Sequence, residues 1–195
     1  MNYSIYAEST PNPEVMKFVS NRMLADKSIE IKNVGEAHGI SIAIELLKFP
    51  FVESIYMSSN FISITKNKNL EWESIAMQLR IFITEHLNSN EITNHTKDIK
   101  VAKENTINDK QYANSRVLTQ KEKEVESILN EYIAPAVESD GGAITLNYYK
   151  ENIVCVDLKG ACSGCPSSTS TLKGGIETLL REKISPEIEV IANEE

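Results

Sequence analysis

Two cysteines separated by two residues form the part of this sequence that is best suited to chemistry. Cys162 and Cys165 lie between a predicted strand and a predicted helix, and Pro166 follows at a position where helices often begin. The unpaired N–H groups and the dipole at a helix N-terminus favour negative charge, so we expect both thiols to ionise readily. Thiolates bind metals and carry out disulfide exchange.

A C-x-x-C pair fits half of a zinc site, a dithiol redox centre, or two ligands of an iron–sulfur cluster. A closed metal site needs four ligands, but His38, His86 and His95 lie far away in the sequence and show no ligand spacing. Cys155 lies within a predicted strand, roughly 13 Å before Lys159 at about 3.3 Å per residue, and we interpret it as a sheet residue. The simplest completion is a second chain that supplies two further thiolates across a two-fold axis. Four thiolates suit a [4Fe–4S] cluster and, less well, a zinc ion.

The cysteine pair belongs to a predicted α+β domain that covers residues 119–195. Thr119 and Glu122 have the spacing of a capping box, which predicts a helix start, and Glu122, Glu124 and Glu126 are expected on a solvated helix face. Alternating apolar residues predict strands over 143–149, 153–158 and 188–191, and a second helix is predicted over 167–183. The order α-β-β-α-β predicts an open three-stranded sheet with helices over one face.

A second small α+β domain is predicted over residues 1–88. Its pattern predicts an extended region with a turn at 10–13, a helix over 41–49, a hairpin over 52–65 and a helix over 70–87. Residues 89–118 contain five asparagines and nine charged residues with no apolar period, which predicts a polar linker between the two domains.

Composition excludes several classes of protein. The chain has 195 residues, of which 41% are hydrophobic and 25% charged, and no apolar run reaches the roughly 18 residues of a membrane helix. The net charge is −8, and residues 119–195 hold 14 acidic against 7 basic residues, which argues against nucleic acid or a membrane as partner. Three cysteines without a disulfide framework suggest a reducing compartment. The first residues resemble a strand and not a targeting segment, so we expect a cytoplasmic location.

The C-terminal half resembles the NifU-type domain of Nfu iron–sulfur scaffold and carrier proteins. The resemblance rests on the order and spacing of four segments, which are far more specific than C-x-x-C alone: Asp140-Gly141-Gly142, Leu158 to Ser168, Thr171-Leu172 and Gly175-Ile176-Glu177. By this resemblance Cys162 and Cys165 are the cluster ligands.

The N-terminal half is similar to the N-terminal domain of the same family. The similarity is carried by Thr10-Pro11-Asn12-Pro13, Lys17-Phe18, and Phe61 to Lys66 followed by Trp72. The family resemblance implies transient binding of a cluster, usually [4Fe–4S], and its delivery to apo iron–sulfur client proteins. It also implies contacts with assembly proteins, which we expect the N-terminal domain to make.

The sequence therefore predicts an iron–sulfur scaffold or carrier that forms a homodimer when its cluster is bound. No constellation of catalytic acid, base or nucleophile stands out, so we do not expect an enzyme. Two alternatives use the same cysteine pair: a thioredoxin-like dithiol oxidoreductase and a zinc-stabilised interaction module.

Overall fold

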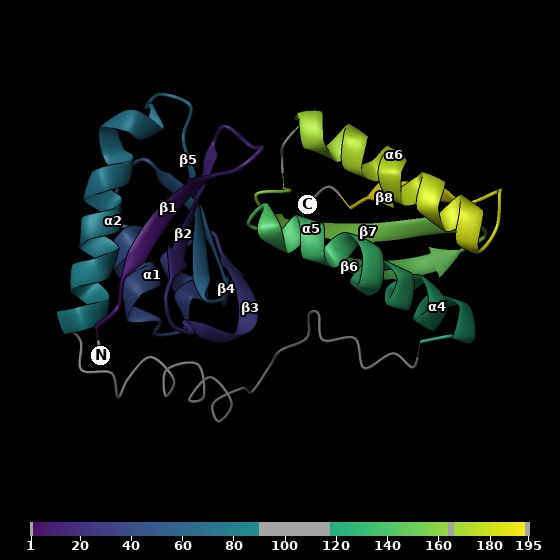
Figure 1. The fold of residues 1–195 in the computed structure, drawn as a ribbon, viewed down its shortest axis with the longest axis horizontal. Helices are drawn as coiled ribbons and strands as arrows, with labels where there is room; N and C mark the ends of the chain where they lie inside the picture. Colours follow the sequence, from purple (N-terminus) through teal and green to yellow (C-terminus); the bar gives the residue numbers. More distant parts are fainter. Residues whose placement is uncertain (1, 90–117, 164–165, 194–195) are drawn as a thin grey trace. The chain divides into compact units, whose positions relative to one another are not determined.

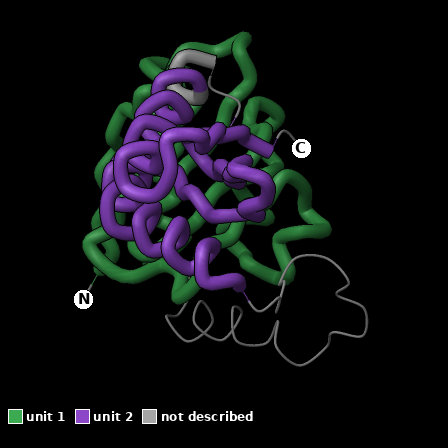
Figure 2. The backbone as a smooth tube through the Cα atoms, turned by 90° about the vertical axis from the view of Figure 1, so that its right-hand side faces the viewer, with its two compact units in different colours: residues 1–110 green, residues 111–195 purple. Residues whose placement is uncertain are grey.

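The computed structural model of the chain describes residues 2–89, 118–163 and 166–193. The chain divides into two compact units, Met1–Lys110 and Gln111–Glu195, which are coloured separately in Figure 2. Each unit contains its own mixture of helices and strands, so the predicted α+β class is confirmed (Figure 1). The predicted linker falls almost wholly on residues 90–117, outside the described residues.

The first unit is a five-stranded antiparallel sheet in the order β1-β2-β5-β4-β3. Its elements are β1 (Ile5–Ser9), β2 (Val15–Ser20), β3 (Ala25–Ile31), η1 (Val34–Ala37), α1 (Ser41–Leu46), β4 (Val52–Ser59), β5 (Phe61–Lys66) and α2 (Trp72–Ser89). The core lies between α1, α2 and the sheet face that carries Phe18, Ile62 and Ile64. The predicted hairpin and both predicted helices are present, although α1 ends at Leu46, before the predicted end at residue 49.

The sequence did not predict β3 and η1. The strand β3 has the burial pattern of an edge strand, with Asp26, Lys27 and Ser28 exposed between buried ends. Its register with β4 also shifts between Ala25 and Ile29. A strand of this kind forms because the neighbouring strand supplies hydrogen bonds, and its own residues give no regular apolar alternation.

The second unit contains a three-stranded sheet, as predicted, and its strands lie in the order β6-β7-β8. Its elements are α4 (Gln120–Ile128), the π-helical turn η2 (Leu129–Ile133), α5 (Ala134–Ser139), β6 (Gly142–Lys150), β7 (Ile153–Gly160), α6 (Pro166–Lys183) and β8 (Glu189–Ala192). The strands β6 and β7 are antiparallel, and β8 runs parallel to β7. Side chains from α4, α5 and α6 form one core with Val154, Val156 and Val190. The helices therefore cover one face of the sheet.

A capping box starts α4, and a π-helical turn follows this helix. The Thr119 hydroxyl accepts a hydrogen bond from the Glu122 backbone N–H at 3.3 Å, and the Glu122 carboxylate accepts one from the Thr119 N–H at 2.8 Å. The predicted capping box is thus present. The predicted solvated position of Glu122 is wrong, since this residue is fully buried. Its carboxylate also accepts the Tyr149 N–H at 3.4 Å. The π-helical turn precedes Pro135, whose missing N–H interrupts the α-helical pattern.

Candidate metal centre

The predicted ligand Cys162 lies between β7, which ends at Gly160, and α6, which begins at Pro166. Its side chain is 5% exposed and belongs to the core of the second unit. Gly160 has a φ of +61°, a conformation that glycine adopts without strain, and its carbonyl accepts the Ser163 N–H at 3.1 Å. The second predicted ligand, Cys165, lies outside the described residues.

The segment that precedes β6 lies directly against this loop. Gly141 has a φ of +83° and donates its N–H to the Glu138 carbonyl at 3.0 Å, so it ends α5 in the turn that the sequence predicted. Its own carbonyl accepts the Ala161 N–H at 3.2 Å. The turn and the cysteine loop are therefore joined by a backbone hydrogen bond.

The next residue, Gly142, lies against the cysteine itself. A Cβ atom at this position would come within 2.8 Å of the Cys162 Sγ and 2.7 Å of the Lys159 carbonyl oxygen, distances that real Cβ atoms essentially never show. The sequence pattern did not indicate this contact, because Gly141 and Gly142 have the pattern of an ordinary turn.

Cys155, the third cysteine, is part of the sheet, as the sequence predicted. It pairs with Tyr148 on β6 and Ile191 on β8, and it alternates with the core residues Val154 and Val156. Its side chain therefore points to the face of the sheet opposite the helices, whereas Cys162 packs in the core on the helix side.

The environment of Cys155 favours a protonated thiol. The side chain is 4% exposed, and burial raises the pKa of the Cys155 thiol above its ordinary value. The neighbouring Tyr148 side chain acts in the opposite direction and lowers the pKa of Cys155, and the negative charge of Asp157 raises it further. Burial also raises the pKa of Tyr148. These properties suit a structural cysteine more than a thiolate ligand.

The histidines add no ligands to Cys162 in the described part of the chain. His38 has left-handed backbone at the end of η1, and the His86 Nε2 lies 3.0 Å from the Ser41 Oγ in the first unit. His95 falls outside the described residues. Within residues 2–89, 118–163 and 166–193, no three histidine, cysteine, aspartate or glutamate side chains gather where they could hold a metal ion.

In the first unit, the Thr10–Pro13 turn is held by contacts within the same unit. The Thr10 hydroxyl donates to the Val15 carbonyl at 2.9 Å and accepts the Asn12 N–H at 3.2 Å. The Trp72 indole donates to the Pro13 carbonyl at 3.0 Å. Two segments of the predicted family pattern, the Thr10–Pro13 turn and Trp72, therefore meet at one corner.

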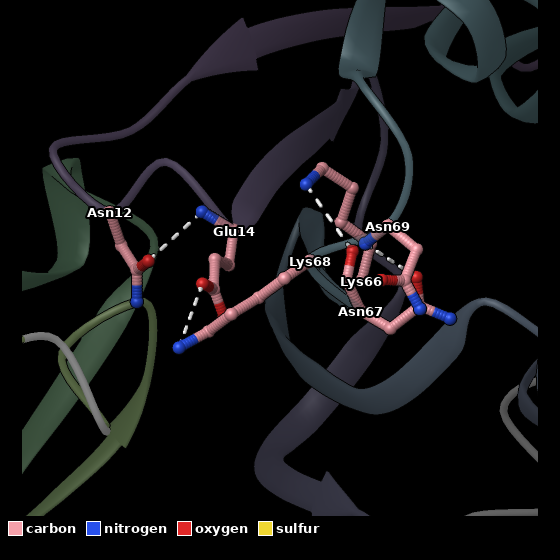
Figure 3. A network of polar contacts seen from close by, with 6 residues as sticks. All are labelled: Asn12, Glu14, Lys66, Asn67, Lys68 and Asn69. Carbon is pink, nitrogen blue, oxygen red and sulfur yellow. Dashed lines mark hydrogen bonds and ion pairs between the residues drawn. The ribbon is translucent and has the colours of Figure 1, made fainter.

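A polar network surrounds this corner (Figure 3). The Asn12 side chain accepts the Glu14 N–H at 3.0 Å, and the Glu14 carboxylate pairs with Lys68 at 3.5 Å. Lys66 is buried, and its ammonium donates to the Asn67 carbonyl at 3.4 Å and lies 5.7 Å from the centroid of the Trp72 ring. These contacts fix the turn without any need for a ligand.

Sequence comparisons match both units to known protein families. The family described as "Scaffold protein Nfu/NifU N terminal" matches residues 5–90, and the family described as "NifU-like domain" matches residues 125–191. The two matched ranges leave residues 1–4, 91–124 and 192–195 uncovered.

Relatives with both halves occur in distant organisms. The chain is 30% identical to the NFU1 iron–sulfur cluster scaffold homologue of Drosophila ananassae, over 97% of this chain and 64% of the relative. It is 28% identical to NifU-like protein 4 of Arabidopsis thaliana, over 93% of this chain and 62% of the relative. The chain thus spans a little under two thirds of the length of these relatives. The solution structure of a NifU-like protein from Saccharomyces cerevisiae is 30% identical and covers 46% of this chain and 82% of that protein, with a TM-score of 0.40.

The names of the relatives contradict the predicted cytoplasmic location. Both the Drosophila and the Arabidopsis proteins are named as mitochondrial. The prediction is wrong because it rested on the character of the first few residues. Of these, Ile5 and Tyr6 begin β1, and a strand pattern carries no information on the compartment. Among the described helices, none combines the length and the apolar character needed to cross a membrane.

Proposed function

We propose that this chain, which belongs to the family of Nfu/NifU iron–sulfur scaffold proteins, binds a [4Fe–4S] cluster through Cys162 and Cys165 and delivers it to apo client proteins. Two chains each contribute their cysteine pair, so that four thiolates enclose one cluster. The cluster is cargo, and we assign the chain no catalytic role of its own.

The position of Cys162 is the observation that carries this proposal. The cysteine lies at the end of a strand and directly before a helix that begins at Pro166, in the unit that matches the NifU-like domain. The described residues supply no third ligand, and Cys155 points to the opposite face of the sheet. Beyond the Cys162 and Cys165 pair, the cluster therefore needs two further thiolates, and a second copy of the chain is the simplest source of them.

Transfer by this route is ligand exchange and involves no change of redox state. A thiolate of the client donates an electron pair to one iron, and the bond from that iron to a cysteine of the scaffold breaks. The departing sulfur leaves as a thiolate and can take up the proton that the client thiol gave to water. Because Cys162 is 5% exposed in the folded chain, its sulfur must reach the surface before it can exchange with a client thiolate.

We further propose a division of labour along the chain. Residues 119–195 hold the cluster, residues 89–118 connect the two domains, and residues 1–88 contact client or assembly proteins. The corner where Trp72 meets the Thr10–Pro13 turn is held by hydrogen bonds within the first unit, so it offers a stable platform for such contacts.

Anaerobic reconstitution tests the proposal against its two rivals. The purified chain is incubated with iron and sulfide, and separately with zinc, and the bound metal is measured. We expect a visible iron–sulfur absorption band that is lost in Cys162→Ser and Cys165→Ser and kept in the matched control Cys155→Ala. Tight zinc without iron uptake would favour the interaction module, and disulfide reduction without any metal would favour the oxidoreductase.

A further inference from the structure

We infer that Gly142 is a positioning residue for Cys162, and that it keeps the sulfur of this ligand sheltered in the folded chain. The inference depends on the proposed function only because that proposal makes Cys162 a ligand. The contact between the two residues is a property of the folded chain itself.

The geometry around Gly142 leaves no room for a side chain. This residue pairs with Gly160 at the end of the β6–β7 ladder, where the chain leaves β7 and turns back toward β6. A Cβ on Gly142 would lie 2.8 Å from the Cys162 Sγ, 3.1 Å from the Cys162 backbone nitrogen and 2.7 Å from the Lys159 carbonyl oxygen. Two of these three atoms are backbone, so they cannot move aside as the end of a flexible side chain can.

Glycine is required here for space and not for backbone conformation. Among the described residues of the second unit, Gly141 and Gly160 have a positive φ, and Gly142 does not share this property. An alanine could therefore adopt the backbone of Gly142 without strain, and its only cost would be the collision with the cysteine loop. The effect of a substitution at this position thus reports on the contact with Cys162 and Lys159.

The consequence of the close contact is a ligand thiol that is poorly accessible. The Cys162 side chain lies between Gly142 and the core and is 5% exposed. A sulfur in this position is protected from oxidants and alkylating reagents, whose attack needs an exposed thiolate. The Cys162 sulfur must move out of this position before it can bind iron that is shared with another chain. Gly142 therefore sets how easily the ligand becomes available.

Alkylation of the cluster-free chain tests this inference independently of iron binding. Wild type and Gly142→Ala react with iodoacetamide under native conditions, and mass spectrometry with fragment ions separates Cys155, Cys162 and Cys165. We expect Cys162 of Gly142→Ala to react about tenfold faster, as for a loss of about 1.4 kcal/mol of protection. Cys155 is an internal control, because it is also buried but lies on the other face of the sheet.

A matched glycine variant controls for the loss of glycine itself. Gly175 lies in α6, where an added Cβ would meet nothing within 4 Å, so Gly175→Ala should leave both alkylation rates unchanged. An unchanged Cys162 rate in Gly142→Ala would overturn the inference. A parallel rise at Cys155 and Cys162 would also overturn it, because that result indicates general destabilisation.

A double-variant cycle keeps the inference testable if Gly142→Ala folds poorly. Removing the sulfur with Cys162→Ala relieves one of the two closest collisions. We expect the Gly142→Ala change to shift the unfolding constant about tenfold less in the Cys162→Ala background than in wild type, because residues in contact have coupled effects on stability. Equal shifts in both backgrounds would refute the contact. If wild type takes up no iron, the proposed function fails, but the alkylation and stability results still decide the role of Gly142.

Discussion

The indole N–H of Trp72 donates a hydrogen bond to the carbonyl oxygen of Pro13, 3.0 Å away and 59 residues earlier in the chain. The bond ties the first residue of α2 to the turn between β1 and β2. The same ring packs edge-to-face against Phe18 of the core, with 6.4 Å between the centroids. One side chain thus joins the helix, the turn and the sheet of the first unit.

Replacing Trp72 by phenylalanine should destabilise the first unit while keeping most of the aromatic packing. The variant leaves the Pro13 carbonyl without its indole donor, and we expect a loss of about 1–2 kcal/mol in the free energy of unfolding. Urea denaturation followed by circular dichroism measures it. Met77 lies on the same helix and is 59% exposed, so Met77→Ala is a suitable control and should have little effect. Equal midpoints for Trp72→Phe and wild type would show that the hydrogen bond contributes nothing.

The capping box of α4 gives a prediction for the second unit. Thr119→Ala removes the hydroxyl that accepts the Glu122 N–H and also donates to the Glu122 carboxylate at 2.9 Å. We expect a loss of about 1 kcal/mol, the usual effect of removing an N-cap side chain. Hydrogen exchange of the α4 amides measures the change, and Glu124→Ala, at an exposed position on the same helix, is the control.

The fluorescence of Trp72 tests whether the stability lost in Thr119→Ala is confined to the second unit. It is the only tryptophan of the chain and lies in the first unit. Its fluorescence should therefore follow the unfolding of that unit and remain unchanged in Thr119→Ala. A shifted fluorescence transition would mean that the two units unfold together.

Much of the fold could be predicted because apolar periods and turn residues reflect local structure. The α-β-β-α-β order of the second unit follows from such patterns, and the capping box from Thr119 and Glu122 alone. The strand β3 could not be found in this way, because it depends on pairing with β4 more than on its own residues. The burial of Glu122 was missed for a similar reason: its contact with Tyr149 bridges 27 positions in sequence.

The candidate site shows the same division. The spacing of Cys162 and Cys165 is local, so the sequence alone is enough to identify both as candidate ligands. The role of Gly142 is not local, because the contact arises only when β6 and β7 pair and return the cysteine loop to the end of the sheet. A turn of two glycines gives no indication of which one is needed for φ and which for space.

Cys155 should make the protein less stable in alkali. Burial raises the pKa of its thiol in the folded chain. Below the ordinary thiol pKa of about 8.5 both states hold the proton, and this contribution to stability is complete. As the pH rises above that value, the unfolded chain loses its proton first, so stability falls until the pH has passed the raised folded pKa.

Urea midpoints measured from neutral pH to about pH 10 test this expectation. Cys155→Ala should show a smaller alkaline loss of stability than wild type. Tyr148, whose pKa is also raised, should account for part of the loss that remains in this variant. Identical pH profiles for wild type and Cys155→Ala would contradict the assignment of Cys155 as a buried neutral thiol.

The mass and iron content of the reconstituted protein test the central claim most directly. Native mass spectrometry under anaerobic conditions reports both quantities on one species. We predict a complex of two chains with four irons and four sulfides, which falls to cluster-free single chains or dimers in the Cys162→Ser/Cys165→Ser double variant. A full cluster on a single chain, or a cluster that survives in the double variant, would contradict the account.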